Sequence, residues 1–310
     1  MAGLLNQRLA EVVETTEDFA FHQAIPDEIF DAVLEKHGKA QNRRGVKLPH
    51  WLVLRLITGL AFLRDLDIPT VLERVAAPFR APKTWLGNVP HSTSIAQARD
   101  RLGFDVVRDL FRSFAAYLAA RASPRWHGLL VVAIDGTMLD TPDTEANHSE
   151  FGRPNGRNGS SGFPKLRMVA AVSTVTHFVL GCVLSPCSGT GSGEQSLARS
   201  LIEFLQPDWL LLMDKGFCGY PWLSELGERP FLVRKTQGKT CVKPKRVGPA
   251  IKKRVDYWVD YLPKTAERGA QPLRLRWIRI KRRRRKGRYK WVEFLTNLPP
   301  DRYSYEELAE

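Results

Sequence analysis

The fold is decided by the segment Val131-Val132-Ala133-Ile134-Asp135-Gly136-Thr137, an apolar run that ends in an acidic residue followed by glycine. A continuous apolar run of this length is typical of a strand that is buried on both faces of a sheet. An aspartate that ends such a strand lies at the edge of the sheet, where ligands and metal ions can reach it. The segment therefore predicts an α/β core with a functional carboxylate at Asp135.

A second apolar run has the same pattern. It reads Leu210-Leu211-Leu212-Met213-Asp214-Lys215-Gly216-Phe217 and again ends in an aspartate. Carboxylates from neighbouring strand ends are oxygen ligands that Mg²⁺ prefers, and two of them can hold a metal pair for phosphoryl transfer. In the alternative, each aspartate only stabilises the turn that follows its strand. The pair predicts a two-metal site at Asp135 and Asp214, a kind of site that usually requires a third carboxylate.

The composition favours a nucleic-acid partner. The 310-residue chain has a formal net charge of +14, and an excess of this size favours a polyanion. Its 43% hydrophobic content is typical of a folded protein. The four cysteines form no Cys-x-x-Cys pair, so structural zinc is not expected. The sequence has no pattern of a secretion signal or of a membrane span, and its cysteine pattern suits a reducing compartment, so a cytoplasmic protein is expected.

The chain divides into two predicted domains. Residues 1–123 carry several helical patterns and form a helical N-terminal domain that we expect to bind DNA. In residues 124–310 the pattern changes to three strands, a helix from Glu194 to Leu205 and a fourth strand. This order is that of an RNase H-like mixed sheet, so the fold class is α/β. The strands are expected at residues 129–134, 166–175, 178–184 and 209–213.

A basic, strand-rich insertion is predicted within the core at about residues 232–290. Its arginines and lysines are candidates for phosphate contacts, and Trp277 or Trp291 could stack on an unpaired base. In the alternative, the tryptophans pack inside a hairpin and the charges are solvated. The candidates for DNA contact are Arg274, Arg276, Trp277, Arg279, Lys281, Arg282, Arg283, Arg284, Arg285 and Lys286.

A helix of the N-terminal domain adds two further candidates. Residues 92–102 are predicted to be helical and fit the second helix of a helix-turn-helix, which would turn Arg99 and Arg101 toward DNA. An ordinary packed helix explains the same pattern equally well.

Several short motifs occur along the chain in a characteristic order. In the helical part they are Ile25 to Gly38, Lys47-Leu48-Pro49 and Ser94 to Gly103. In the second part they are Ala133 to Thr137, Phe163 to Arg167, Gly193 to Gln195, Asp214 to Phe217 and Leu295 to Leu298. With this order and spacing, the chain resembles the insertion-sequence-4-type transposases, a group of DDE transposases, over essentially its whole length.

The resemblance implies that Asp135 and Asp214 are the first two acids of the family's catalytic triad, with Mg²⁺ or Mn²⁺ at a two-metal site. It places the third acid on a helix that follows the strand of residues 295–298. Residues 304–310 look like the start of that helix, and the chain then ends, so the last catalytic helix is expected to be missing. Glu194 is a further candidate metal ligand, unless it is only an acid at a helix start.

We therefore expect a DNA transposase of an insertion sequence that cleaves and transfers strands at transposon ends, with activity impaired by the missing acid. Its partner would be double-stranded DNA, at transposon ends and target, with self-association on DNA and no contact with membranes. One alternative is a non-catalytic remnant that binds element ends or regulates complete transposases. Another is a general RNase H-like nuclease, which would cut without regard to terminal repeats.

Overall fold

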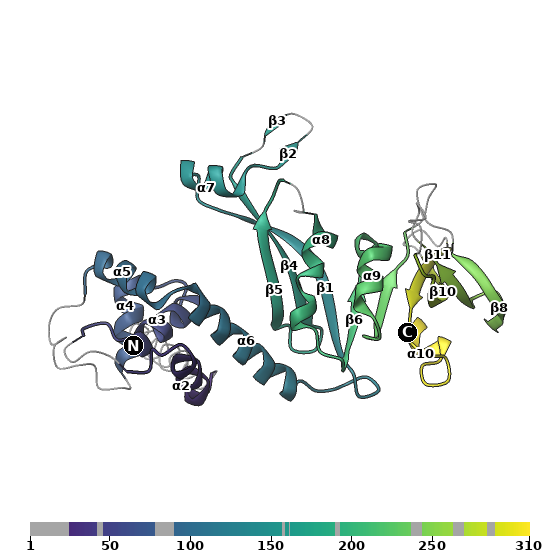
Figure 1. Ribbon diagram of the computed structural model, residues 1–310, viewed down its shortest axis with the longest axis horizontal. Coiled ribbons are helices and arrows are strands. Elements are labelled where there is room, and N and C mark those ends of the chain that lie inside the picture. Colours follow the sequence, from purple (N-terminus) through teal and green to yellow (C-terminus); the bar gives the residue numbers. More distant parts are fainter. Residues whose placement is uncertain are drawn as a thin grey trace, which may run out of the picture. The chain divides into compact units, whose positions relative to one another are not determined.

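The computed structural model describes residues 25–41, 46–77, 90–156, 159–160, 162–189, 193–236, 244–262, 270–283 and 289–310 (Figure 1). The chain forms two compact units, a helical unit of residues 1–117 and a sheet unit of residues 118–310. Their boundary lies within helix α6 (Phe104–Arg121). No helix in the described ranges is both long and apolar enough to cross a lipid bilayer.

The helical unit is held together by one apolar core. Its helices before α6 are α2 (Asp27–Lys36), α3 (His50–Phe62), α4 (Ile68–Ala76) and α5 (Ser92–Leu102), which agree with the predicted helical segments. Helix α3 is apolar on most of its surface, and Leu52, Leu54 and Leu56 are completely buried. Gly103 ends α5 with a φ of +82°, a conformation that glycine adopts without strain.

A carboxylate on α6 ties this helix to the end of α2. The Lys36 Nζ donates a hydrogen bond of 2.7 Å to the Asp109 Oδ2, and the His37 Nε2 lies 3.0 Å from the same oxygen. These contacts, the lysine first, lower the pKa of the Asp109 carboxyl to about 2. The ionised form of Asp109 is therefore part of the folded helical unit.

The sheet unit is a mixed α/β structure. Its long strands are β1 (Leu130–Asp140), β4 (Lys165–Ser173), β5 (Val179–Pro186), β6 (Trp209–Met213), β7 (Phe231–Arg234), β8 (Lys245–Lys252), β9 (Asp256–Tyr261), β10 (Leu273–Arg283) and β11 (Tyr289–Thr296). Its helical elements are α7 (Glu145–Phe151), α8 (Glu194–Arg199), η3 (Ile202–Phe204), η4 (Lys215–Phe217), α9 (Tyr220–Leu226) and α10 (Tyr305–Ala309). The short strands β2 (Asn155–Gly156) and β3 (Gly159–Ser160) pair separately.

The described long strands form one sheet in the order β5-β4-β1-β6-β7-β11-β10-β9-β8. Strands β1, β6 and β7 are parallel neighbours, and all other neighbouring pairs are antiparallel. The strands of the predicted insertion therefore extend the same sheet through β11 (Figure 1).

The sheet has two differently covered faces, because successive side chains of a strand point to opposite sides. Leu130, Val132 and Ile134 of β1 face the larger core, to which α8 and α9 contribute. Val131 of β1 belongs to a smaller cluster with Tyr303 and Leu308, around α10. We call these sides the α8 face and the α10 face.

Three elements of the sheet unit differ from the sequence expectations. Strand β1 continues to Asp140, because it stays paired with β4 beyond the end of β6. The helix expected at residues 194–205 is divided into α8 and η3. Strand β7 was not predicted, since its four residues are too few to give a periodic signal.

The edge strand β8 is strongly basic and irregular. Its ends carry Lys245 and Lys252, and its pairing with β9 shifts register twice. Gly248 has a φ of +70° and is followed by Pro249, which has no N–H to donate. These features interrupt the hydrogen-bonding edge of the sheet.

Candidate active site

The two aspartates identified from the sequence occupy matched positions on neighbouring strands. In the parallel pair of β1 and β6, Ile134 lies opposite Met213, and the next residues are Asp135 and Asp214. Both follow residues of the α8 face, so both carboxylates belong to the α10 face. Both are exposed. The fold therefore brings together two carboxylates that are far apart in the sequence.

Asp135 lies inside β1, and the expectation that it ends the strand is wrong. It is paired with Ala170 of β4, and the ladder continues to Asp140. The Asp135 Oδ1 accepts a hydrogen bond of 2.8 Å from the Gly136 N–H. The carboxylate is reachable because β6 ends beside it, while β4 keeps its backbone fixed.

Asp214 begins a tight turn that is held from both sides. The Gln195 Nε2 donates a hydrogen bond of 2.5 Å to the Gly216 carbonyl oxygen. The Thr236 Oγ1 donates one of 3.1 Å to the Lys215 carbonyl oxygen. Phe217 is buried in the large core, which anchors the end of the turn. The position of the Asp214 carboxylate therefore depends on α8 and on the residues after β7.

An arginine completes the row across the sheet. Met213 lies opposite Val233 of β7, so Arg234 follows at the level of Asp214. The Arg234 Nη1 lies 3.7 Å from the Asp214 Oδ1, and the two side chains are 44% and 52% exposed. A guanidinium at this position places a positive charge beside the carboxylate.

Glu194 lies on the other side of β1 from the aspartates. A methyl group at Gly136 would come within 2.8 Å of the Glu194 carboxyl carbon, so this glycine leaves the space that Glu194 occupies. Gly136 points to the α8 face, as Ile134 does. The Glu194 Oε1 also lies 3.3 Å from the Arg167 Nη1. The structure thus pairs Glu194 with an arginine.

The aspartate pair suits a hard divalent cation. Mg²⁺ is commonly held by one or two carboxylates, together with water and substrate phosphates, and Asp135 and Asp214 supply this oxygen set. Among the residues that the structure describes, no three His, Cys, Asp or Glu side chains are grouped closely enough to hold a metal ion.

Several predicted DNA contacts lie on the outer half of the sheet. Arg274 is exposed and is paired with Asp260 at 2.8 Å. Lys281, Arg282 and Arg283 are exposed at the end of β10. Arg279 is 28% exposed, with its guanidinium over the Trp291 ring. The predicted contacts Arg284, Arg285 and Lys286 lie outside the described residues.

Arg276 is buried, which corrects its assignment as a DNA contact. Its side chain is 0% exposed and forms an ion pair of 2.5 Å with Asp256, which is also 0% exposed. It further donates hydrogen bonds to the carbonyl oxygens of Leu298 and Tyr303. All these partners belong to the protein, so Arg276 joins β9 and β10 to the turn before α10.

The Trp277 ring packs beneath several basic side chains. It is partly buried against the large core, and its ring lies near the cationic groups of Lys235, Arg246 and Arg279. Cation–π contacts of this kind hold the cations over an apolar surface.

Arg99 and Arg101 are exposed on α5, as predicted. Residues 78–89, between α4 and α5, lie outside the described residues. The helix-turn-helix with α5 as its second helix therefore stays a prediction.

Three residues of the site were missed by sequence reasoning. Gln195 lies within a motif to which no role was assigned. Arg234 ends a strand that was not predicted, and Thr236 follows it. The sequence did contain one indication of Arg234. Residues 231–233 form a short apolar run that is followed by a charged residue, as in the two strands that precede Asp135 and Asp214.

Comparisons with known proteins agree with this geometry. Residues 17–112 match the family model of the insertion element 4 transposase N-terminal region, and residues 126–310 match the transposase DDE domain. The transposase InsG for insertion sequence element IS4 of Escherichia coli is 29% identical over 197 residues, which are 61% of this chain and 41% of InsG. The putative transposase InsZ of the same organism is 30% identical over 145 residues, 46% of this chain and 48% of InsZ.

The matched segments thus span less than half the length of each of these curated relatives. The transposase DDE domain model covers more than half of this chain and contains both aspartates. The chain therefore belongs to the DDE transposase family, and its first part is similar to the N-terminal region of insertion element 4 transposases.

Proposed function

We propose that this chain acts in DNA transposition of an insertion sequence, by cleaving and transferring strands at transposon ends. The observation that carries the proposal is the register of β1 and β6, which brings Asp135 beside Asp214 within the segment that matches the transposase DDE domain. Two neighbouring exposed carboxylates on a basic protein are suited to phosphodiester chemistry, because they can recruit cations to a polyanionic substrate.

Asp135 and Asp214 would hold Mg²⁺ or Mn²⁺. The bound metal supplies Lewis-acid stabilisation of the phosphoryl oxygens and makes water a better nucleophile near neutral pH. Asp135 provides a ligand fixed within a strand, and Asp214 provides one held by Gln195 and Thr236 through the turn backbone. Arg234 lies where it can neutralise Asp214 before the cation arrives.

The reaction that we propose has two transfers. In cleavage, a water oxygen bonds to the phosphorus and the bond to the 3′ oxygen breaks, which leaves a 3′-hydroxyl and a 5′-phosphate. In strand transfer, that 3′-hydroxyl loses its proton and bonds to a phosphorus of the target, and the target's own 3′ oxygen leaves as a hydroxyl. The residues of the chain orient the strands and balance the charge of these phosphates.

The strand order supports an RNase H-like core for this chemistry. Strands β5-β4-β1-β6-β7 form a mixed sheet in which only β1, β6 and β7 are parallel. On this proposal β8, β9 and β10 belong to the insertion within the core at about residues 232–290. Among the described residues no third carboxylate is grouped with Asp135 and Asp214. Glu194 stays the candidate for a further ligand, since its Oε2 lies 3.7 Å from where a methyl group at Gly216, in the Asp214 turn, would be.

The proposed DNA surface follows the exposed basic residues. On the sheet unit these are Arg274, Lys281, Arg282 and Arg283, together with the half-buried Arg279 and with Arg284, Arg285 and Lys286 as the continuation of the run. On the helical unit they are Arg99 and Arg101. Their contacts would be with phosphates, so binding should weaken as salt rises. Self-association would bring two transposon ends together.

The test combines purified protein with Mg²⁺ or Mn²⁺ and duplex DNA that carries the sequences flanking the coding region. The expected result is cleavage at a defined position, reduced at least about 100-fold by Asp135→Asn or Asp214→Asn, since several kcal/mol of transition-state stabilisation are removed. Asp140→Asn is the matched control, because Asp140 is on the same strand and is 64% exposed. Equal activity of all four proteins would contradict the proposal.

A non-catalytic DNA-binding role is the second candidate. It is favoured by one observation, the absence of a third carboxylate beside Asp135 and Asp214 among the described residues. Sequence-preferring binding to the same duplex without cleavage in either metal, and unchanged in Asp135→Asn, would support this role over the enzymatic one.

A further inference from the structure

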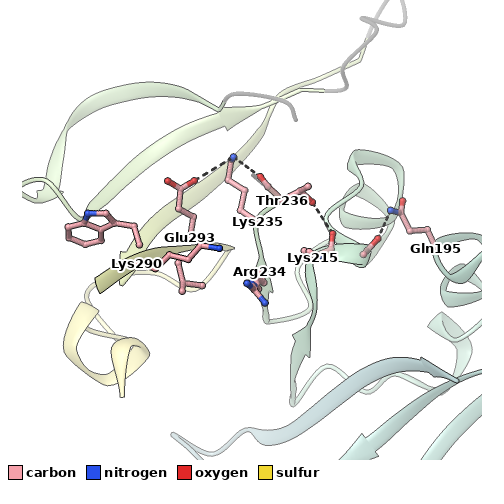
Figure 2. Close-up of a pocket in the computed structure, with 10 residues that line it drawn as sticks. Gln195, Lys215, Arg234, Lys235, Thr236, Lys290 and Glu293 are labelled. Atoms are coloured by element: carbon pink, nitrogen blue, oxygen red, sulfur yellow. Dashed lines mark hydrogen bonds and ion pairs between the residues drawn. The ribbon is translucent and has the colours of Figure 1, made fainter. Parts of the chain in front are cut away.

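A cavity of about 430 Å³ opens beside the turn that carries Asp214 (Figure 2). One wall is the turn itself, with Lys215 and Gly216, and the opposite wall is β11, with Lys290 and Glu293. Arg234 lies between them at the end of β7. This volume is within the range of sites that bind small molecules or groups of a larger ligand.

The walls of the cavity are strongly basic. Four lining residues are basic, namely Lys215, Arg234, Lys235 and Lys290, and one is acidic, Glu293. The Lys235 Nζ, in a side chain only 8% exposed, lies 3.6 Å from the Glu293 Oε2. The Arg279 Nε lies 3.5 Å from the other Glu293 oxygen, so the single acid is already shared by two cations.

The two other lysines of the cavity, Lys215 and Lys290, form no ion pair with a described residue. Among the described residues, neither the Lys215 nor the Lys290 side chain lies within ion-pair distance of a carboxylate. They belong to facing walls, one on the turn and one on β11 (Figure 2). Two positive charges gathered at one cavity repel each other, and an anion between them removes that cost.

The cavity is also preformed where it meets the aspartates. Gln195 and Thr236, which line it, hold the Lys215–Gly216 backbone through the hydrogen bonds already described. On the opposite side, the backbone N–H of Lys235 donates a hydrogen bond of 2.7 Å to the Glu293 carbonyl oxygen. This bond joins the end of β7 to β11. A ligand would therefore meet fixed walls, which lowers the entropic cost of binding.

We propose that this cavity is a subsite for a phosphate group of the DNA strand, bound between Lys215 and Lys290 with help from Arg234. The inference rests on the proposed function, since a strand whose scissile phosphate lies at Asp214 would pass next to Lys215. It adds contacts that the sequence did not suggest. The subsite would hold the strand close to the aspartates, and the basic run of β10 would bind DNA farther away.

The test measures the affinity of the full chain for a labelled duplex between about 50 and 200 mM salt. In the variant Lys215→Met with Lys290→Met, the magnitude of the slope of log K against log[salt] is expected to fall by about 0.9, since one phosphate is no longer neutralised. At about 0.1 M salt this slope change corresponds to a roughly 8-fold loss of affinity. The charge-preserving variant Lys215→Arg with Lys290→Arg should recover most of it.

The matched control is Arg64→Met with Arg302→Met, which removes the same formal charge from two exposed residues outside the cavity. Circular dichroism checks that each variant is folded. A wild-type slope in the Lys215 and Lys290 variant, or an equal loss in the control, would overturn the subsite and leave DNA binding intact. Binding of wild type that does not depend on salt would overturn the proposed function itself.

The same proteins distinguish a DNA phosphate from a free one. Inorganic phosphate and a deoxynucleoside monophosphate are titrated into wild type by calorimetry. Weak binding of both, with the loss of DNA affinity described above, supports the DNA strand as the ligand. Tight binding of either probe that is abolished in the double variant, without a change in the DNA slope, would assign the cavity to a free phosphate compound instead.

Discussion

Two arginine–aspartate pairs lie on the same sheet and differ almost only in their exposure. Arg276 and Asp256 are both 0% exposed, and their ion pair of 2.5 Å connects β10 to β9. Arg234 and Asp214 are 44% and 52% exposed and are 3.7 Å apart. The first pair has all its partners inside the protein. The second has open space around it and a basic cavity beside it.

Burial, not residue type, separates an ion pair that belongs to the fold from one whose carboxylate stays open to other cations. A buried charge that loses its partner is not solvated by water instead, so breaking a buried pair strongly destabilises the folded protein. An exposed pair contributes little to stability, because water and salt screen it. Asp214 can therefore exchange Arg234 for another cation at small cost, whereas Asp256 cannot leave Arg276.

The largest effect is expected for Asp256→Asn. It leaves the guanidinium of Arg276 buried without a counter-charge, which should lower the free energy of unfolding by about 3–5 kcal/mol. Asp214→Asn makes the same chemical change at the exposed pair and should cost less than about 1 kcal/mol. Urea unfolding followed by circular dichroism compares the two. Similar losses in both variants would remove the distinction between the pairs.

An intermediate effect is expected at Asp109, whose carboxylate is 9% exposed and whose partner Lys36 is 67% exposed. The folded pKa of about 2 lies below the unfolded value of about 3.9, so ionised Asp109 stabilises the protein above pH 4. This contribution disappears as the pH falls through the folded pKa. After allowance for screening by solvent it should be about 1–2 kcal/mol.

Urea unfolding at a series of pH values compares wild type with Asp109→Asn. The difference in stability should be largest above about pH 4 and should shrink toward pH 2. Asp105→Asn, a change at a 66% exposed residue of the same helix, is the matched control and should show a much smaller pH dependence. A constant difference across this range would show that the Asp109 carboxylate is not stabilised by its ionisation.

The smallest effect is expected for Arg234→Met. The free energy of unfolding should change by no more than about 0.5 kcal/mol, because the Arg234–Asp214 pair is exposed. Removing the neighbouring positive charge should tighten Mn²⁺ binding by up to about fivefold, which corresponds to about 1 kcal/mol for a divalent ion and a unit charge about 8 Å apart in water. Calorimetric titration of the full chain measures this. Weaker Mn²⁺ binding would mean that Arg234 orients Asp214.

The sequence was most informative where a local pattern decides the structure. The apolar runs before Asp135 and Asp214 predicted two buried strands, and the bounds of β6 agree with the predicted residues. The helices of the N-terminal region were predicted by their apolar spacing and by breakers such as Gly103. These features depend on neighbours within a few residues, so one sequence contains them.

Features that depend on long-range pairing were not predicted. Arg274 and Arg276 lie two residues apart on β10, and each pairs with an aspartate of β9. Only Arg276 is buried, because the segment before α10 binds it through the carbonyl oxygens of Leu298 and Tyr303. The extension of β1 past Asp135 depends on β4, and the restraint of Asp214 depends on Gln195 and Thr236 from other elements. Such contacts appear only when the topology is known.

The irregular edge strand β8 affects how the protein behaves at high concentration. The open edge of a sheet can pair with a strand of another molecule, and sheets with a straight, apolar edge aggregate in this way. Here the shifted pairing, Pro249 and the flanking lysines make the last strand a poor template. The sheet can therefore extend several strands beyond the aspartates, and its last strand still does not pair with the edge strand of another molecule.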